Sequence, residues 1–444
     1  MTTVYQYIAI CTGDPVHQEF VWGTSLPSTC SIDGSPIDTN LSSAIRSIST
    51  NDVTLTNLPN STFGEVPTAE LTPLIQLNFT YNNCPQLVTE TLTGSGSTTN
   101  TDGMAVASSS AAISSSARLA TNLPIKNRSG QGILVRFTAV FSAGVAGNDQ
   151  YAGAYDIVNG IGFGFNGIDF GIFKRSDSIT DWYLQTDWNV DKLDGTGPSG
   201  VNIDFGVGYG NVFEIKYKSN GFGGIVFKVE NPYTAQLIVV HVIQYANSSS
   251  TPTFENDSFP ICIESINTTN NTNVDIKSTS MFAALEGQIV YSGPQFTDTW
   301  NGDVTVTTDE TFIKAFRVKS TFGGKTNKSI IYPILASFST GSTDQGQILR
   351  IRKNGVITGG TWNDIDTGSS CVECNTDGSW SLGANEGMTI IQKNVPSKGD
   401  PTVINMTPSS SGLYLVADDI LIITGESVKS KGINIGSLTW IEDQ

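Results

Sequence analysis

The sequence predicts an all-β protein, with a small N-terminal hairpin module followed by two β-sandwich, jelly-roll-like domains. Charged residues make up only 15% of the 444 residues, below the ~25% of an ordinary globular protein, and Ser, Thr, Asn and Gly take their place. Ser, Thr and Asn compete with the helical backbone for hydrogen bonds, whereas β-branched residues fit a pleated surface. No long stretch carries a clear apolar period of 3.6 residues. We therefore expect more than a third of the residues in strands and helix below about 10%.

Residues 1–55 are predicted to form an anchoring module of their own. Residues 5–10 alternate as a strand does, and residues 19–23 follow as the hairpin partner. A short helical turn is expected to start at Ser42. A stretch rich in Pro and Asn, residues 57–73, then links the module to the next domain.

Residues 65–300 are predicted to form the first β-sandwich domain. Alternate apolar residues within 133–141 lie on one face of a strand. Residues 160–165 and 168–173 are two apolar runs separated by Asn166-Gly167, and Asn-Gly between such runs strongly indicates a hairpin. Strand candidates recur about every 10 residues, as in sandwiches and jelly rolls.

Residues 301–444 are predicted to form a second β-sandwich or jelly-roll domain. Its series of strand candidates begins at Phe312 and ends at Trp440. That length of about 130 residues suits one domain of ordinary size.

The charge balance and hydropathy of the chain exclude two classes of partner. A net charge of -17 with no run of Lys or Arg argues against nucleic acid, because phosphate binding needs a basic surface. No apolar run approaches the ~20 residues that cross a bilayer. The first ten residues lack the basic region and long apolar core of a secretory signal. We expect no nucleic-acid partner, no membrane insertion, and synthesis in a cytosol.

Two pairs of segments in the first domain are distinctive. Residues 130–146 read Gly-Gln-Gly-Ile-Leu-Val-Arg-Phe-Thr-Ala-Val-Phe-Ser-Ala-Gly-Val-Ala, and the glycine-spaced aromatics of 162–175 follow. Residues 188–200 read Trp-Asn-Val-Asp-Lys-Leu-Asp-Gly-Thr-Gly-Pro-Ser-Gly, and residues 221–229 follow. Over residues 65–300 the chain resembles a β-sandwich family of virion proteins (capsid, penton or spike-type) in large DNA viruses and tailed phages. The resemblance implies a structural component of the virion, made in the host cytoplasm, and no catalytic residues.

One acidic segment has the spacing of a calcium loop. Asp187, Asn189, Asp191 and Asp194 place oxygen ligands at near-alternate positions. The Gly at position 6 and the Glu at position 12 of an EF-hand are absent, and Lys192 lies inside the loop. The competing interpretation is a structural loop in which Asp and Asn cap turns. These four residues are kept as a candidate calcium set, while no metal and no cofactor are expected.

No residue pattern indicates an enzyme. Residues 162–167 match G-x-G-x-x-G, but a strand follows where a dinucleotide site needs a helix. The glycines are instead expected to let aromatic side chains pack across a tight hairpin. Only two histidines exist, His17 and His241, so a Ser/His/Asp triad is not expected. Cys371 and Cys374 have zinc-knuckle spacing without a second pair, and free, partly buried thiols are expected.

The function predicted from these observations is a structural component of a virus particle, such as a penton, minor capsid or spike protein. It would assemble as a homo-oligomer on the capsid, with other capsid proteins as partners, and the choice between pentamer and trimer stays open. The acidic residues Asp187, Asp191 and Asp194 are expected on outer loops, away from the subunit contacts. The alternative is a host-attachment fibre or lectin-like protein that binds a host-surface glycan through exposed Trp and Tyr.

Overall fold

A computed structural model describes residues 70–444 except 127, 219–220, 292, 342–345, 382–387, 398–400 and 407–412. Before residue 70 it describes the backbone of three strands, Thr29 and Pro36. Strands account for 57% of the structure, and the helical content of the described part is one 3-10 turn, η2 (Gln185–Asp187). The predicted all-β class is confirmed. Within the same residues, no helix has the length and apolar character to cross a membrane.

The chain divides into two compact units, residues 1–69 and residues 70–444. The first unit contains an antiparallel sheet in the order β2–β1–β3. Its strands are β1 (Thr3–Cys11), β2 (His17–Gly23) and β3 (Ser43–Ser49). The predicted hairpin is confirmed, with Tyr5 opposite Gly23 and Ile10 opposite Gln18.

The helical turn predicted at Ser42 is wrong, because β3 begins at Ser43 and pairs with β1. Pairing with a neighbouring strand outweighs a weak local capping pattern. The predicted linker falls mostly on residues 51–69, which lie outside the described residues. Its last residue, Pro73, belongs to strand β4 (Leu71–Asn78) of the second unit.

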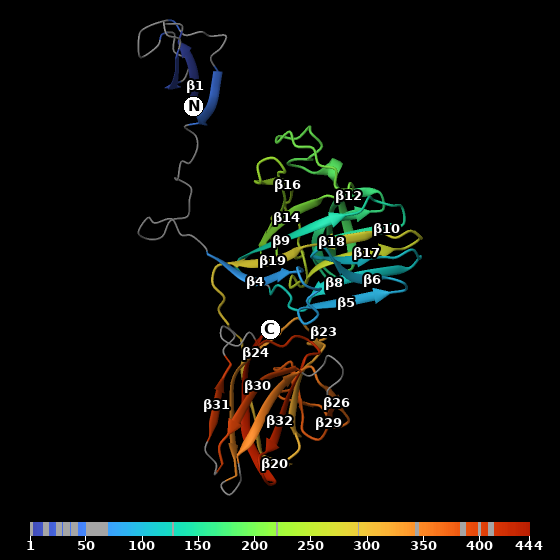
Figure 1. The fold of residues 1–444 in the computed structure, drawn as a ribbon, viewed down its shortest axis with the longest axis vertical. Helices are drawn as coiled ribbons and strands as arrows, with labels where there is room; N and C mark the ends of the chain where they lie inside the picture. Colours follow the sequence, from blue (N-terminus) through green and yellow to red (C-terminus); the bar gives the residue numbers. More distant parts are fainter. Residues whose placement is uncertain are drawn as a thin grey trace. The chain divides into compact units, whose positions relative to one another are not determined.

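Two antiparallel sheets form the first sandwich of residues 70–444 (Figure 1). The seven-stranded sheet contains, in spatial order, β13 (Ile179–Leu184), β12 (Asp169–Ser176), β11 (Gly160–Asn166), β10 (Asn148–Tyr155), β17 (Ile261–Asn267), β8 (Ser115–Thr121) and β5 (Val88–Thr93). The nine-stranded sheet contains β16 (Leu237–Ile243), β15 (Ile225–Glu230), β14 (Gly210–Lys218), β9 (Gly132–Phe141), β18 (Asp275–Ser278), β7 (Met104–Ser108) and β6 (Ser97–Thr101), with β19 (Ser280–Glu286) on β9 and β4 (Leu71–Asn78) on β19.

One hydrophobic core fills the space between these two sheets. The predicted alternation in 133–141 is confirmed, because its odd-numbered residues are all at most 1% exposed. Aromatic rings from the two sheets meet there, such as Phe163 and Phe213 with 4.7 Å between ring centroids. The predicted Asn-Gly hairpin is also confirmed, with Asn166 opposite Asp169 and Gly167 at a φ of +61°.

A second sandwich, drawn in orange to red in Figure 1, has its own core around Phe316, Phe338 and Trp440. Its four-stranded sheet contains β20 (Gln295–Val306), β33 (Gly432–Asp443), β24 (Ile330–Thr340) and β31 (Thr402–Asn405). Its six-stranded sheet contains β27 (Asn363–Asp364), β28 (Val372–Asn375), β21 (Thr311–Val318), β32 (Ile420–Ser427), β25 (Gln347–Lys353) and β30 (Met388–Val395). Two small ladders pair β22 (Thr321–Phe322) with β23 (Lys325–Thr326) and β26 (Val356–Thr358) with β29 (Ser379–Ser381). Strand β20 runs across the predicted domain boundary at residue 300, so this sandwich begins at Gln295.

Candidate functional site

The hairpin of β11 and β12 alternates glycine with large apolar residues. Ile161 and Phe163 are fully buried in the core, so Gly162 and Gly164 lie on the opposite, outer face of the seven-stranded sheet. A Cβ atom on Gly162 would lie 2.6 Å from Cε1 of Phe173, whose ring occupies that side. Glycine is therefore required at position 162, where the ring of Phe173 lies across β11. This agrees with the prediction that the glycines let aromatic side chains pack across the hairpin.

Four aromatic side chains from three strands form a cluster on this outer face. Tyr151 and Tyr155 come from β10, Phe173 from β12 and Trp182 from β13. The ring of Phe173 packs edge-on against both tyrosines, with centroid distances of 5.1 Å to Tyr151 and 5.2 Å to Tyr155. Trp182 lies 5.6 Å from Tyr151. Tyr155 and Phe173 are fully buried, whereas Trp182 is only partly buried and offers solvent a ring surface.

Two arginines lie over the ring of Tyr155. Their guanidinium carbons are 5.2 Å (Arg118) and 5.5 Å (Arg175) from the ring centroid, a distance at which a cation is attracted to the ring. Nη2 of Arg118 donates to the carbonyl oxygen of Tyr155 at 2.9 Å and to Sγ of Cys262 at 3.0 Å. Nη1 of Arg175 donates to the carbonyl oxygen of Asp156 at 2.8 Å. These acceptors are uncharged, so they neutralise neither guanidinium group.

Two carboxyl groups belong to the same face. Glu264 lies opposite Tyr151 across β10 and β17, and Asp149 is two residues before that tyrosine. The hydroxyl of Tyr155 donates to Oε2 of Glu264 at 3.2 Å. Burial raises the pKa of Glu264, against the opposing effect of Arg118 and Tyr155, and burial also raises the pKa of Asp149. The two carboxyls are diagonal neighbours on adjacent strands, a position that places their Cα atoms about 7–8 Å apart.

We call these residues the aromatic and charged face: Arg118, Asp149, Tyr151, Tyr155, Phe173, Arg175, Trp182, Cys262 and Glu264. None of these side chains is recognisable as a site residue from the sequence alone. One sequence feature points to the face, namely glycine at alternate positions of β11, since such glycines leave room for rings from neighbouring strands.

The candidate calcium residue Asp191 is a structural cap. Its side chain is 2% exposed, and its two carboxylate oxygens accept from the backbone N–H groups of Leu193 at 2.9 Å and Ser199 at 2.8 Å. The expectation that Asp191 lies on an outer loop is therefore wrong. The carboxylate points inward because it accepts hydrogen bonds from two backbone N–H groups further along the same loop, which would otherwise lack a partner.

The other three candidate calcium residues are directed elsewhere. The side-chain amide of Asn189 pairs with the backbone of Val242, donating at 2.8 Å and accepting at 2.9 Å. Asp194 is exposed and accepts from the backbone N–H of Thr196 at 2.9 Å, and Asp187 is also exposed. Among the described residues, no group of three or more His, Cys, Asp or Glu could hold a metal ion. The arrangement favours the turn-capping interpretation.

The remaining sequence candidates are packed side chains. His241 is 4% exposed, its Nδ1 accepts from the backbone N–H of Asn189 at 3.2 Å, and burial lowers its pKa. Cys371 and Cys374 are free thiols packed in the second core. Burial raises the pKa of Cys371 to about 12, which disfavours the thiolate that binds zinc. The side chain of His17 lies outside the described residues.

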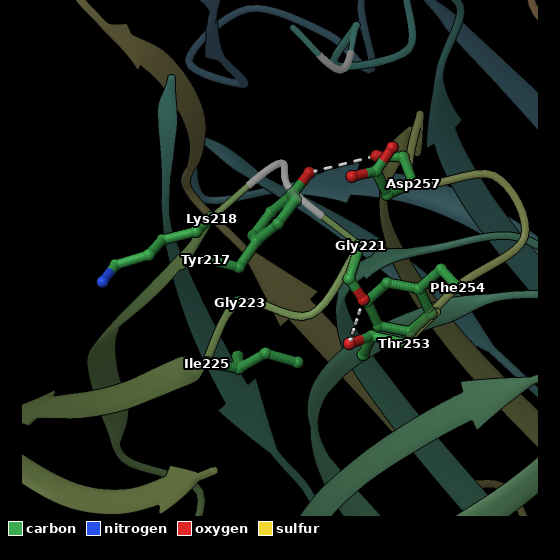
Figure 2. A pocket seen from close by; sticks show the side chains of 8 residues that line it. All are labelled: Tyr217, Lys218, Gly221, Gly223, Ile225, Thr253, Phe254 and Asp257. Carbon is green, nitrogen blue, oxygen red and sulfur yellow. Dashed lines mark hydrogen bonds between the residues drawn. The ribbon is translucent and has the colours of Figure 1, made fainter. Parts of the chain in front are cut away.

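A small pocket lies where β14 turns into β15 (Figure 2). Its volume of about 10 Å³ is room for a single water molecule. The hydroxyl of Tyr217 donates to the carbonyl oxygen of Asp257 at 3.3 Å. The backbone N–H of Thr253 donates to the carbonyl oxygen of Gly221 at 2.7 Å. The side chain of Lys218 extends away from the pocket in Figure 2. These contacts fasten a loop to the sheet, and the space is too small for a ligand.

No family model and no curated protein matches the sequence. Solved structures with a similar fold include the lectin I-B4 of Griffonia simplicifolia, with 12% identity and a TM-score of 0.32 over 48% of this chain and 99% of that one. A legume lectin-like domain of Entamoeba histolytica has 11% identity and a TM-score of 0.30 over 48% and 98%. A prokaryotic β-1,3-1,4-glucanase from a mouse hindgut metagenome has 13% identity and a TM-score of 0.33 over 49% and 100%.

Proposed function

We propose that this chain is a host-attachment component of a virus particle whose first sandwich binds a glycan through the aromatic and charged face. One observation carries the glycan-binding part: a partly exposed Trp182 packs against Tyr151 on a sheet face that also holds two arginines and two carboxyls. The C–H faces of sugar rings stack on aromatic rings, and sugar hydroxyls bond to charged side chains. The virion location is supported by the resemblance of residues 130–146 and 188–200 to virion proteins.

We further propose that this face binds its glycan without cleaving it. A glycosidase needs one carboxyl as acid and a second as base or nucleophile, both free to reach the glycosidic bond. Here the hydroxyl of Tyr155 bonds to Glu264, and the hydroxyl of Tyr151 lies 3.5 Å from Asp149. Each carboxyl is thus held beside a tyrosine of the aromatic cluster, an arrangement that suits recognition.

The test is binding of the full-length chain to a glycan array, followed by calorimetry with the glycans that bind. Trp182→Ala is expected to weaken binding about 10-fold, since losing one stacked ring costs ~1.5 kcal/mol. Tyr81→Ala is the matched control, because Tyr81 is 93% exposed and lies outside the face. Binding that survives Trp182→Ala, or no binding to any glycan, would refute the proposal. Release of reducing sugar from a bound glycan would refute the proposal that this face binds its glycan without cleaving it.

Assembly into a homo-oligomer with capsid neighbours is a second proposed role, favoured by exposed apolar side chains at one end of the first sandwich. Ile168, Val207, Tyr209 and Tyr233 are 66%, 51%, 73% and 80% exposed. Their loops share that end, because Gly210 lies opposite Val140, Phe213 opposite Val229 and Asn166 opposite Asp149. Clustered exposed apolar residues mark interaction sites. Mass photometry at micromolar concentration should show an oligomer that Tyr209→Ser with Tyr233→Ser dissociates, and a wild-type monomer would contradict this role.

A further inference from the structure

Arg118 and Arg175 differ from every other arginine whose side chain the structure describes. The other five each form an ion pair with an Asp or Glu of the chain: Arg128, Arg136, Arg317, Arg350 and Arg352. Within the described residues, Arg118 and Arg175 have no carboxylate at ion-pair distance, and both lie on the aromatic and charged face. The two guanidinium groups without an ion pair thus both lie within 5.5 Å of the centroid of one ring, that of Tyr155.

Two arginines without an ion pair are unusual in a chain of this composition. Asp and Glu number 41 against 24 Lys and Arg, so carboxylate partners are plentiful. Nε of Arg118 is buried and has no hydrogen-bond partner. A largely buried guanidinium without a counter-ion is costly to hold. An anion supplied by a ligand would offset that cost, because a guanidinium N–H forms a strong, charge-assisted hydrogen bond to a carboxylate or sulfate oxygen.

We propose that the glycan bound by this face carries an anionic group, a carboxylate as in uronic and sialic acids or a sulfate. This inference rests on the proposed glycan binding and names its ligand class. The anion binds to the guanidinium groups of Arg118 and Arg175 over Tyr155, and the sugar ring stacks on Trp182. The two carboxyls on the face, Glu264 and Asp149, repel an anion when ionised. Burial raises the pKa of both carboxyls.

The experiment measures the affinity of the full-length chain for matched glycans by calorimetry. The pairs are sialyllactose against lactose, an oligomeric uronate against the corresponding neutral hexose oligomer, and a sulfated sugar against its unsulfated form. The anionic member of at least one pair should bind 10-fold or more tightly. Its affinity should fall as NaCl is raised from 0.05 to 0.5 M, because salt screens the contact. The pair that discriminates identifies carboxylate or sulfate.

Variants assign the preference to the arginines. Arg175→Gln should remove most of the difference between the anionic and the neutral glycan, and Arg175→Lys should retain part of it. Arg118→Gln should do the same if circular dichroism shows the native fold. Arg136→Gln is the matched control, because Arg136 forms its ion pair with Glu214 on the other sheet and should leave the preference unchanged.

The outcomes separate this inference from the function on which it rests. Equal affinity within every pair, with binding lost in Trp182→Ala, would overturn the anionic ligand and leave glycan binding intact. A failure to bind any glycan would overturn both. Equally tight binding of an acidic peptide such as oligoglutamate at the same arginines would overturn the assignment to a sugar.

Discussion

Gly162→Ala tests whether glycine is required on the outer face of the seven-stranded sheet. A methyl group at this position would lie 2.3 Å from the carbonyl oxygen of Ala152 and 2.6 Å from Cε1 of Phe173. Real Cβ atoms do not approach other heavy atoms so closely, so either the pairing of β10 with β11 or the ring of Phe173 must shift. Overpacking of this kind costs ~1–3 kcal/mol. Alanine regains ~0.5–1 kcal/mol over glycine in a strand, and a net loss of about 1–2 kcal/mol remains.

Differential scanning calorimetry of the full-length chain measures this loss. For a domain of this size, ~1 kcal/mol moves Tm by about 2–4 °C, so the transition of the first sandwich should fall by about 2–8 °C. Gly210→Ala is the control, because a Cβ there would meet only Cγ2 of Val140 at an ordinary 3.6 Å. That variant should be as stable as the wild type or slightly more so. Equal Tm values for the two variants would refute the reasoning.

Three further predictions concern a buried carboxyl, a loop cap and the N-terminal unit. Because burial raises the pKa of Glu264, the stability this group supplies is complete below its unfolded pKa of ~4.3 and is lost as pH rises through the folded value. Glu264→Gln should therefore reduce the decline in unfolding free energy above that pH, and an unchanged pH profile would contradict the shift. Asp191→Ala should lower the free energy of unfolding, measured in urea, by about 2–4 kcal/mol, because two backbone donors lose a charged acceptor. A wild-type Tm that rises with added calcium would argue against a purely structural role for this carboxylate. Removing residues 1–69 should leave 70–444 folded, since the two units are separately compact, and a loss of the near-ultraviolet dichroism of the sandwich aromatics would show otherwise.

The all-β class and the local hairpins could be predicted from the sequence because their causes are local. The period-two pattern of 133–141 and the Asn166-Gly167 turn each act within a few residues, and both appear in the structure as expected. Predictions from local patterns were wrong where contacts with other residues determine the structure. Pairing with β1 made a strand of residues 43–49, and the backbone donors of Leu193 and Ser199 drew Asp191 inward.

The candidate site depends on pairings that no local pattern contains. Arg118 lies opposite Glu264, and Glu264 lies opposite Tyr151, through strands more than a hundred residues apart in the sequence. A shift of one residue in either register would turn these side chains into the core. The sequence alone determined that strands alternate and that an acidic chain with few charges folds as β-sandwiches. Only the tertiary structure decided which arginines remain without a carboxylate and which rings they cover, because that choice depends on register between distant strands.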